Sequence, residues 1–210
     1  MEFSKQLHKL IFEDFKGLNL TNYSNYDDFK LLQICDSLKP LEMSSIFKKT
    51  IENAEIVLDI GFGGGFPILP LANLLCNIQF LGIEAKRKKV EAVDVIKNKL
   101  NLNNVRLVHE RIENIVIDKE VVIVVKAVSD IKDLLNKIIT TKKINIFFYK
   151  GPNVEEKENY QEMLQLWNII ENRKYSLQNF QRSIIGFTNK NVPHGTYSKH
   201  DKIPLSKILK

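Results

Sequence analysis

The sequence is poor in the residues that build disulfide frameworks and metal sites. It has only two cysteines, Cys35 and Cys76, and they lie far apart inside apolar segments. This spacing excludes a disulfide framework and a CxxC metal motif. The four histidines are scattered along the chain. We therefore expect no metal site.

Long apolar runs are also missing. The run from Val121 to Val125 is among the longest, yet a membrane-spanning helix needs roughly 20 apolar residues. No secretory leader pattern opens the chain, and no internal repeat is evident. We therefore expect a soluble, cytoplasmic protein that has no membrane partner.

The composition instead favours a globular protein with a charged partner. A chain of 210 residues with 44% hydrophobic residues can form one substantial core. The net charge of +6 suggests a polyanionic partner, although a lysine-rich composition alone would give the same charge. The net charge alone therefore does not decide whether the partner is a nucleic acid.

Hydrophobic spacing divides the chain into an N-terminal helical cap, residues 1–53, and a larger domain, residues 54–210. In the cap, a first amphipathic helix starts at Phe3 and stops near Gly17. A second helix is predicted from about Asp27 to Leu38, and Pro40 is predicted to end it.

Short strands alternate with helices from residue 54 onward. Strands are predicted over residues 56–59, 78–83, 105–109, 121–125, 144–149 and 183–187, and helices over 66–76, 87–100, 130–139 and 155–167. Such alternation is typical of an α/β fold, a parallel sheet with helices on both faces. Ligands of such sheets bind beyond the carboxyl ends of the strands.

The stretch VLDIGFGGGFPILPLA, residues 57–72, predicts a strand, a tight turn and a helix. Gly61, Gly63 and Gly65 occupy alternate positions, where the missing Cβ permits positive φ and close approach of a ligand. Pro67 and Pro70 fix the start of the helix, because proline is harmless only in the first turn. The free N–H groups of that turn favour an anionic group above the loop.

The acid before the glycines narrows the ligand class. A dinucleotide fingerprint requires a third glycine where this chain has Phe66. Asp59 would repel a pyrophosphate but suits a ligand that carries an ammonium and a sulfonium. The pattern resembles the first motif of S-adenosylmethionine-dependent methyltransferases. The alternative is a glycine-rich turn that binds nothing.

Other strand ends supply further candidates. Glu84 ends the second strand, where an acid can accept hydrogen bonds from ribose hydroxyls. After the third strand, Ile112 can flank an adenine ring while Glu113 meets its polar edge. The fourth strand delivers Lys126, which could face phosphate, a carboxylate or solvent. The basic residues 86–89 at the start of a helix are either a phosphate contact or a solvated face.

The C-terminal segment from about residue 189 looks like an irregular basic tail. Its cations greatly outnumber its one acid, Asp201, and they are Lys190, Lys199, Lys202, Lys207 and Lys210. Such a tail could track an RNA backbone. Two segments of the N-terminal helical cap, residues 19–21 and 36–37, contain residue types that favour turns and helix capping. Residue type alone suggests no other role for them.

Taken together, these motifs resemble the glucose-inhibited division protein B family, the bacterial guanine-N7 methyltransferases of small-subunit ribosomal RNA. The resemblance rests on NLT (19–21), DS (36–37), LDIGFGGGFPILPLA, EAKRKKV, ERIEN, FYKG and the basic tail. The paired prolines of GxGxGFPxxPLA are its most specific part. It implies a Rossmann-like class I methyltransferase fold with a mostly parallel seven-stranded sheet, S-adenosyl-L-methionine as cofactor, and 16S ribosomal RNA or the small ribosomal subunit as partner.

The resemblance also implies site residues. Gly61 and Phe66 would contact the cofactor at the first loop, Glu84 would hold its ribose, and Ile112 with Glu113 its adenine end. Lys126 would lie at the same site, where the family typically has arginine. A lysine offers a point charge instead of a planar fork. Two further departures are Gln33, where histidine is usual, and Glu84, where aspartate is common.

Methylation at guanine N7 needs no deprotonation, because N7 carries an in-plane lone pair. We therefore assign no catalytic acid or base and expect catalysis by positioning and charge placement. We expect a monomer. Two alternatives remain: a methyltransferase of another acceptor, either a small molecule or a protein, and a non-catalytic RNA-binding module.

Overall fold

The computed structural model describes residues 2–195 and 202–209. Its N-terminal part is helical, as predicted: α1 (Phe3–Lys9) runs into a π-helical segment (Leu10–Asp14), α2 (Tyr26–Phe29) runs through a second π-helical segment (Lys30–Cys35) into α3 (Asp36–Met43), and α4 (Ser45–Glu52) follows. Asn25 caps α2 by accepting the N–H groups of Asp27 and Asp28, and Ser44 caps α4 by accepting that of Phe47.

The prediction that Pro40 ends the second helix is wrong. The helix continues to Met43 with Pro40 inside it. Proline removes one helical hydrogen bond, but Asp36, Ser37 and Pro40 form the buried face of α3. Packing of that face outweighs the lost bond, since tertiary packing supplies most helix stability in proteins.

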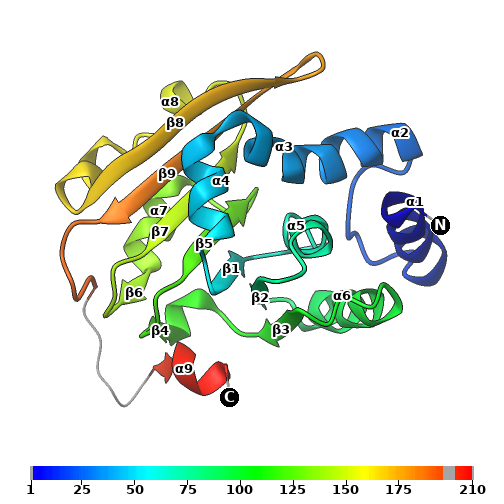
Figure 1. Ribbon diagram of the computed structural model, residues 1–210, viewed down its shortest axis with the longest axis horizontal. Coiled ribbons are helices and arrows are strands. Elements are labelled where there is room, and N and C mark those ends of the chain that lie inside the picture. The colour runs from blue at the N-terminus through cyan, green and yellow to red at the C-terminus, as the bar shows by residue number, and fades with distance from the viewer. Residues whose placement is uncertain (1, 196–201, 210) are drawn as a thin grey trace.

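A mostly parallel seven-stranded sheet forms the centre of the molecule (Figure 1). Its strand order is β3-β2-β1-β5-β7-β9-β8. Strands β1 to β3, β5 and β7 pair in parallel, whereas β9 runs antiparallel to β7 and β8. The strands are β1 (Ile56–Ile60), β2 (Gln79–Glu84), β3 (Val105–His109), β5 (Val122–Lys126), β7 (Asn145–Lys150), β8 (Trp167–Leu177) and β9 (Phe180–Asn189).

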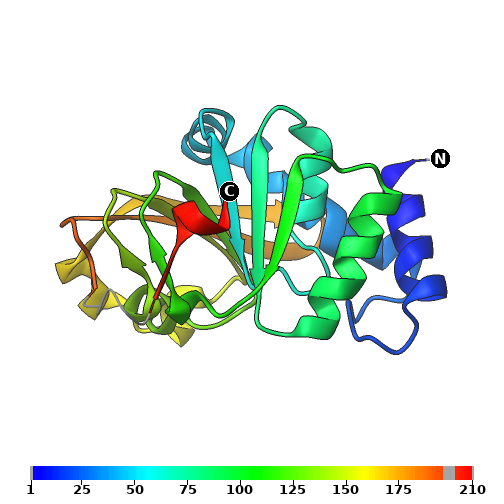
Figure 2. The ribbon, with the colours of Figure 1, turned by 90° about the horizontal axis from the view of Figure 1, so that it is seen from below.

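Helices cover both faces of this sheet (Figures 1 and 2). Successive strand residues point to opposite faces, so Val57 joins one apolar cluster and Leu58 the other. The first cluster contains cap residues together with α5 (Ile68–Leu74) and α6 (Arg87–Lys99). The second contains α7 (Ile131–Lys137) and Leu205 of α9 (Leu205–Ile208). The predicted α/β architecture is confirmed.

The predicted helix over residues 155–167 is wrong. The structure has only α8 (Val154–Lys157), a 3-10 helix (Gln161–Gln165), and then the long strand β8. This strand is at the edge of the sheet, and it exposes many of its side chains between the buried Trp167, Glu171, Tyr175 and Leu177. Polar residues along an edge strand obscure the alternation that normally identifies a strand.

The tail is partly structured: residues 190–195 form bends and one bridge to Thr140, whereas residues 203–208 form a strand and a helix. Asn189 is fully buried, and its side chain bonds the backbone of residues 142, 144 and 191. A small parallel sheet, β10-β4-β6, joins β10 (Ile203–Pro204) to β4 (Ile115–Ile117) and β6 (Ile139–Thr140). The expected irregular tail is therefore wrong for residues 203–208. Lys199, Asp201 and Lys210 lie outside the described residues.

No helix within the described part of the chain is both long and apolar enough to span a membrane.

Candidate functional site

The glycine turn after β1 is shaped by a neighbouring loop. Gly61 has φ +72°, and a Cβ there would lie 2.6 Å from Cγ2 of Val128. Only glycine fits this position, on both conformational and steric grounds. The Gly61 N–H donates to the Ile83 carbonyl at 2.7 Å, which fixes the turn against β2. The helix α5 begins directly after Pro67 and has Pro70 in its first turn, as predicted.

Asp59 lies beneath this turn and is fully buried. Its Oδ2 accepts the N–H of Ile68 at 3.1 Å, so the protein itself supplies an acceptor for the first turn of α5. Its Oδ1 has no hydrogen-bond partner among the described residues. Burial raises the pKa of the Asp59 carboxyl to about 8, and the hydrogen bond from Ile68 opposes that shift.

This raised pKa predicts a pH-dependent stability. The carboxyl has an ordinary pKa of 3.8 and a folded-state pKa of about 8, so the folded state binds the proton more tightly and stability falls as pH rises from about 4 to about 8. We expect Asp59→Asn to remove this slope and to raise the free energy of unfolding at pH 8 by about 2 kcal/mol, after the unpaired amide donor is included.

Urea unfolding of both proteins at several pH values measures this effect. The wild-type stability should fall from about pH 4 to about pH 8 while that of the variant stays constant, so the two curves should cross between these pH values. A constant difference between the two proteins across this range would contradict the assignment to Asp59.

Next to the turn lies a cavity of about 770 Å³. It opens where the carboxyl ends of the parallel strands meet, and the cap closes one side of it. Six of the seven predicted site residues line it, and only Asp59 does not. They are Gly61, Phe66, Glu84, Ile112, Glu113 and Lys126.

Glu84 is held rigidly at the end of β2. Its Oε2 accepts the N–H of Gly63 at 3.1 Å, and its Oε1 accepts the N–H of Lys86 at 2.8 Å. The residue is 8% exposed. The carboxylate therefore joins the glycine turn to the cavity wall, and each oxygen keeps a further lone pair for a hydroxyl donor.

The turn after β3 presents one apolar and one acidic residue. Ile112 is buried, and Glu113 pairs with the Lys137 ammonium at 3.2 Å. Partial burial works to raise the pKa of the Glu113 carboxyl, but the hydrogen bond from its own N–H and the Lys137 ammonium hold it below its ordinary value. Glu113 is therefore an ionised acceptor at neutral pH.

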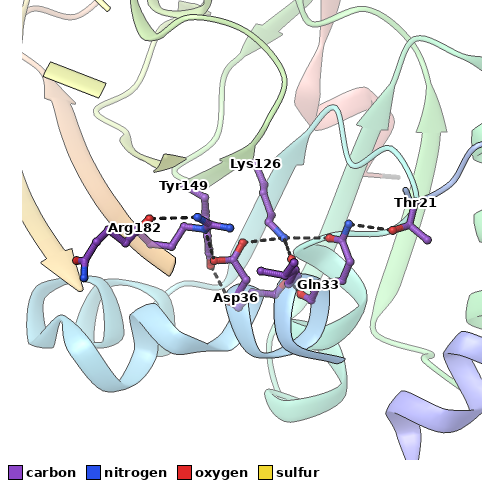
Figure 3. Close-up of polar contacts among 9 residues, drawn as sticks. Thr21, Gln33, Asp36, Lys126, Tyr149 and Arg182 are labelled. Carbon is purple, nitrogen blue, oxygen red and sulfur yellow. Dashed lines mark hydrogen bonds and ion pairs between the residues drawn. The ribbon is translucent and has the colours of Figure 1, made fainter. Parts of the chain in front are cut away.

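Lys126 points toward the cap (Figure 3). Its Nζ lies 3.1 Å from the Leu32 carbonyl, 3.0 Å from Oε1 of Gln33 and 3.0 Å from Oδ2 of Asp36. An ammonium has three N–H donors, so these contacts use all of them. Burial lowers the pKa of Lys126, and Asp36 opposes that shift. Lys126 therefore fastens the cap to the end of β5.

With this geometry in place, comparison with known proteins gives a family. Residues 2–185 match the GidB family, described as rRNA small subunit methyltransferase G. The chain belongs to this family. It is accordingly an S-adenosylmethionine-dependent methyltransferase of ribosomal RNA.

Three curated relatives carry the name ribosomal RNA small subunit methyltransferase G. The protein of Pseudothermotoga lettingae is 34% identical over 67% of this chain and 68% of its own. That of Brachyspira hyodysenteriae is 32% identical over 82% and 79%. That of Campylobacter curvus is 30% identical over 86% and 94%.

Solved structures share the fold at low sequence identity. The structure of MtNAS in complex with MTA and tNA has a TM-score of 0.58 at 12% identity, covering 90% of this chain and 70% of that one. The Escherichia coli protein yhhF has a TM-score of 0.51 at 12% identity, covering 74% and 86%. These likenesses support the fold alone.

In this GidB-family member, residues 19–21 and Asp36, which residue type alone assigned to turns and helix caps, line the cavity. Figure 3 shows the polar contacts of Thr21 and Asp36. The Gln33 amide donates to Oγ1 of Thr21 at 3.1 Å, and Nε of Arg182 lies 3.2 Å from Oδ1 of Asp36. The Tyr149 hydroxyl donates to the Ser37 carbonyl at 2.9 Å. For residues 19–21 and 36–37, the match to the family motifs NLT and DS was the only feature of the sequence that indicated a role at the site.

The cations of the GidB-family cavity differ in how they are paired. Lys126, Lys137, Lys150 and Arg182 each have a carboxylate partner. Lys86, Lys89 and Arg111 also line the cavity, and their side chains show no ion pair or hydrogen bond within the described residues. Free positive charge is therefore concentrated near the ends of β2 and β3.

Residues 2–195 and 202–209 contain no group of three or more histidine, cysteine, aspartate or glutamate side chains that could hold a metal ion.

Proposed function

We propose that this GidB-family protein transfers a methyl group from S-adenosyl-L-methionine to N7 of a guanine in 16S ribosomal RNA. The proposal rests chiefly on one juxtaposition. The glycine turn, Glu84 and the Ile112–Glu113 turn line the same cavity, and Gly63 links the first two through its N–H. This combination suits a ligand that has a ribose between an adenine and a charged amino acid end.

Each residue has a proposed role toward the cofactor. Gly61 and Phe66 form the wall beside its methionine end, Glu84 accepts from the ribose hydroxyls, and Ile112 and Glu113 hold the adenine. Gly61 lines the cavity, and its missing Cβ lets Val128 of the neighbouring loop pack against the same turn. When bound, the cofactor supplies an electrophilic methyl group on a sulfonium.

Asp59 and Lys126 act indirectly in this proposal. Asp59 lies under the turn and accepts the Ile68 N–H, so it holds the start of α5 beneath the cofactor loop without lining the cavity. Lys126 holds the cap in place, because its three donors already have acceptors in the protein. The position that is usually arginine in the family therefore contributes to the shape of the site.

The protein performs the reaction by positioning. Guanine N7 carries a free in-plane lone pair and no proton, so accepting the methyl group that the cofactor would supply requires no general base from the protein. The cavity would hold the purine in line with the methyl group and would exclude water. The entropy cost of bringing two molecules together is then met by binding, before the chemical step. The Glu84 and Glu113 carboxyl groups would stay in fixed positions beside the bound cofactor, where they favour the positive charge that accompanies methyl transfer.

The unpaired cations Lys86, Lys89 and Arg111 suit the phosphates of the RNA strand that carries this guanine. Binding to RNA should then weaken steeply as salt rises, whereas binding to a small neutral acceptor should not. We further propose that the protein acts as a monomer in the cytoplasm, where ribosomal RNA is found.

Transfer of labelled methyl groups to small-subunit RNA that lacks the modification tests the reaction. After nuclease digestion, the label should appear in 7-methylguanosine. Label in another nucleoside, or only in a protein or small molecule, would overturn the assigned acceptor. Absence of cofactor binding would favour a non-catalytic RNA-binding module.

Substitution of Glu84 tests the cofactor site. We expect Glu84→Ala to raise the dissociation constant for S-adenosylmethionine by about 10- to 100-fold, because hydrogen bonds to a charged acceptor contribute about 1.5–3 kcal/mol. The matched control is Glu91→Ala on α6, where the carboxylate is exposed and pairs with Arg87. Calorimetric titration measures both, and equal affinities would contradict the ribose role.

A further inference from the structure

The C-terminal segment returns to the cofactor side of the molecule after the β8–β9 hairpin. Its short strand β10 pairs in parallel with β4, with Ile203 opposite Ile115 and Pro204 opposite Val116. Figure 1 shows α9 beside β4, at the lower edge of the sheet. The strand β4 directly follows the turn that carries Ile112 and Glu113. Residues distant in sequence are thus attached to the proposed adenine site.

Leu205 and Ser206 anchor this segment firmly. Leu205 is fully buried in the second apolar cluster. The Ser206 N–H and hydroxyl donate to the two oxygens of Asp118, at 2.8 and 2.5 Å. Asp118 follows β4 immediately, so the segment binds both the strand and the residue after it.

Lys202 connects the segment to the turn itself. Its Nζ lies 2.6 Å from the backbone carbonyl oxygen of Glu113. This is a charge-assisted hydrogen bond, and such bonds are short and strong. The carboxylate of the same residue pairs with Lys137 at 3.2 Å. Glu113 is therefore held by its backbone from one side and by its side chain from another.

From these contacts we infer that residues 202–206 form a clamp that holds the Ile112–Asn114 turn in the geometry that binds adenine, with Lys202 as a positioning residue. The inference rests on the proposed role of Ile112 and Glu113. The clamp lies beyond residue 185, where the family match ends. It acts on the cofactor only through the turn, since Lys202 is not among the residues that line the cavity.

Removal of the Lys202 ammonium tests the clamp. We expect Lys202→Met to raise the dissociation constant and the KM for S-adenosylmethionine by about 3- to 10-fold with kcat unchanged, because part of one charge-assisted hydrogen bond is lost. Lys202→Arg retains a donor and should restore binding. The control Lys207→Met removes an equal charge from an exposed position on α9 and should bind normally.

The outcomes separate the clamp from the proposed function. Normal cofactor binding by the wild type together with unchanged binding by Lys202→Met overturns the clamp and leaves the function intact. Equal losses in Lys202→Met and Lys207→Met also overturn it, since the effect would then be general charge. Absence of cofactor binding by the wild type overturns the function and the clamp together.

Hydrogen exchange on the wild-type protein supplies a test that needs no variant. Binding free energies are reciprocal, so S-adenosylhomocysteine should slow amide exchange at residues 203–206 if the turn and the clamp are coupled. The β8–β9 hairpin tip, residues 177–180, serves as the internal control and should be unaffected. Unchanged exchange at residues 203–206 with ligand bound overturns the clamp.

Discussion

Gly64→Ala is expected to destabilise the protein by more than about 3 kcal/mol and to abolish cofactor binding. A Cβ at this position would lie 2.0 Å from the carbonyl oxygen of Leu20. The obstacle is backbone, so no side-chain rotation can relieve it. The cap segment around Leu20 would have to move away from the glycine turn, and Thr21 would lose the hydrogen bond from Gln33.

Gly63→Ala is the matched control, because the neighbouring glycine has open space. A Cβ there would meet nothing closer than 3.8 Å, although the residue has φ +55°. The left-handed conformation costs a non-glycine residue about 1–2 kcal/mol. Urea unfolding of both variants should therefore rank Gly64→Ala well below Gly63→Ala. The opposite ranking would contradict the proposed packing of the cap on the turn.

This ranking shows a limit of sequence reasoning at the glycine loop. The alternate positions 61, 63 and 65 identified the turn correctly, and all three have positive φ. The local pattern gives no signal for Gly64, because its constraint comes from Leu20, a residue 44 positions earlier that belongs to the cap. Local pattern reports the conformation of a turn, whereas close approach between distant segments depends on tertiary packing.

The same distinction explains the strands. The parallel strands β1, β2, β5 and β7 are apolar runs buried on both faces, and their predicted bounds agree with the structure to within about one residue. The strands β4, β6 and β10 were not predicted. They have two or three residues each, and they pair with one another in a separate small sheet. Strands this short carry no periodic signal.

At the candidate site, the residue types at strand ends were informative. Parallel strands end at one edge, so Glu84, Glu113 and Lys126 were expected near one another, and all three line the cavity. Their contacts were not predictable. Lys126 was expected at the ligand but bonds to residues 32, 33 and 36, about ninety positions away. Two positions that depart from the family pattern, Gln33 and Lys126, thus contact each other.

The buried charges between the cap and the sheet predict a second large effect. Asp36 is 4% exposed, and its carboxylate pairs with Lys126 at 3.0 Å and with Arg182 at 3.2 Å. We expect Asp36→Ala to lower the free energy of unfolding by about 3–5 kcal/mol, because two largely buried cations lose their common partner. The cavity wall that Asp36 shares with Lys126 would open, and affinity for the cofactor should fall.

Two comparisons isolate this charge cluster in urea unfolding experiments. Glu42→Ala, in the same helix, removes an exposed pair with Lys39 and should change stability by less than about 1 kcal/mol. The double variant Asp36→Ala, Lys126→Met should recover part of the loss, since it removes one of the stranded cations. A loss below about 1 kcal/mol for Asp36→Ala, or a double variant as unstable as the sum of its single changes, would mean that apolar packing alone docks the cap. The expected coupling would instead make the Asp36 cluster the device that sets the position of the cap over the methyltransferase cavity.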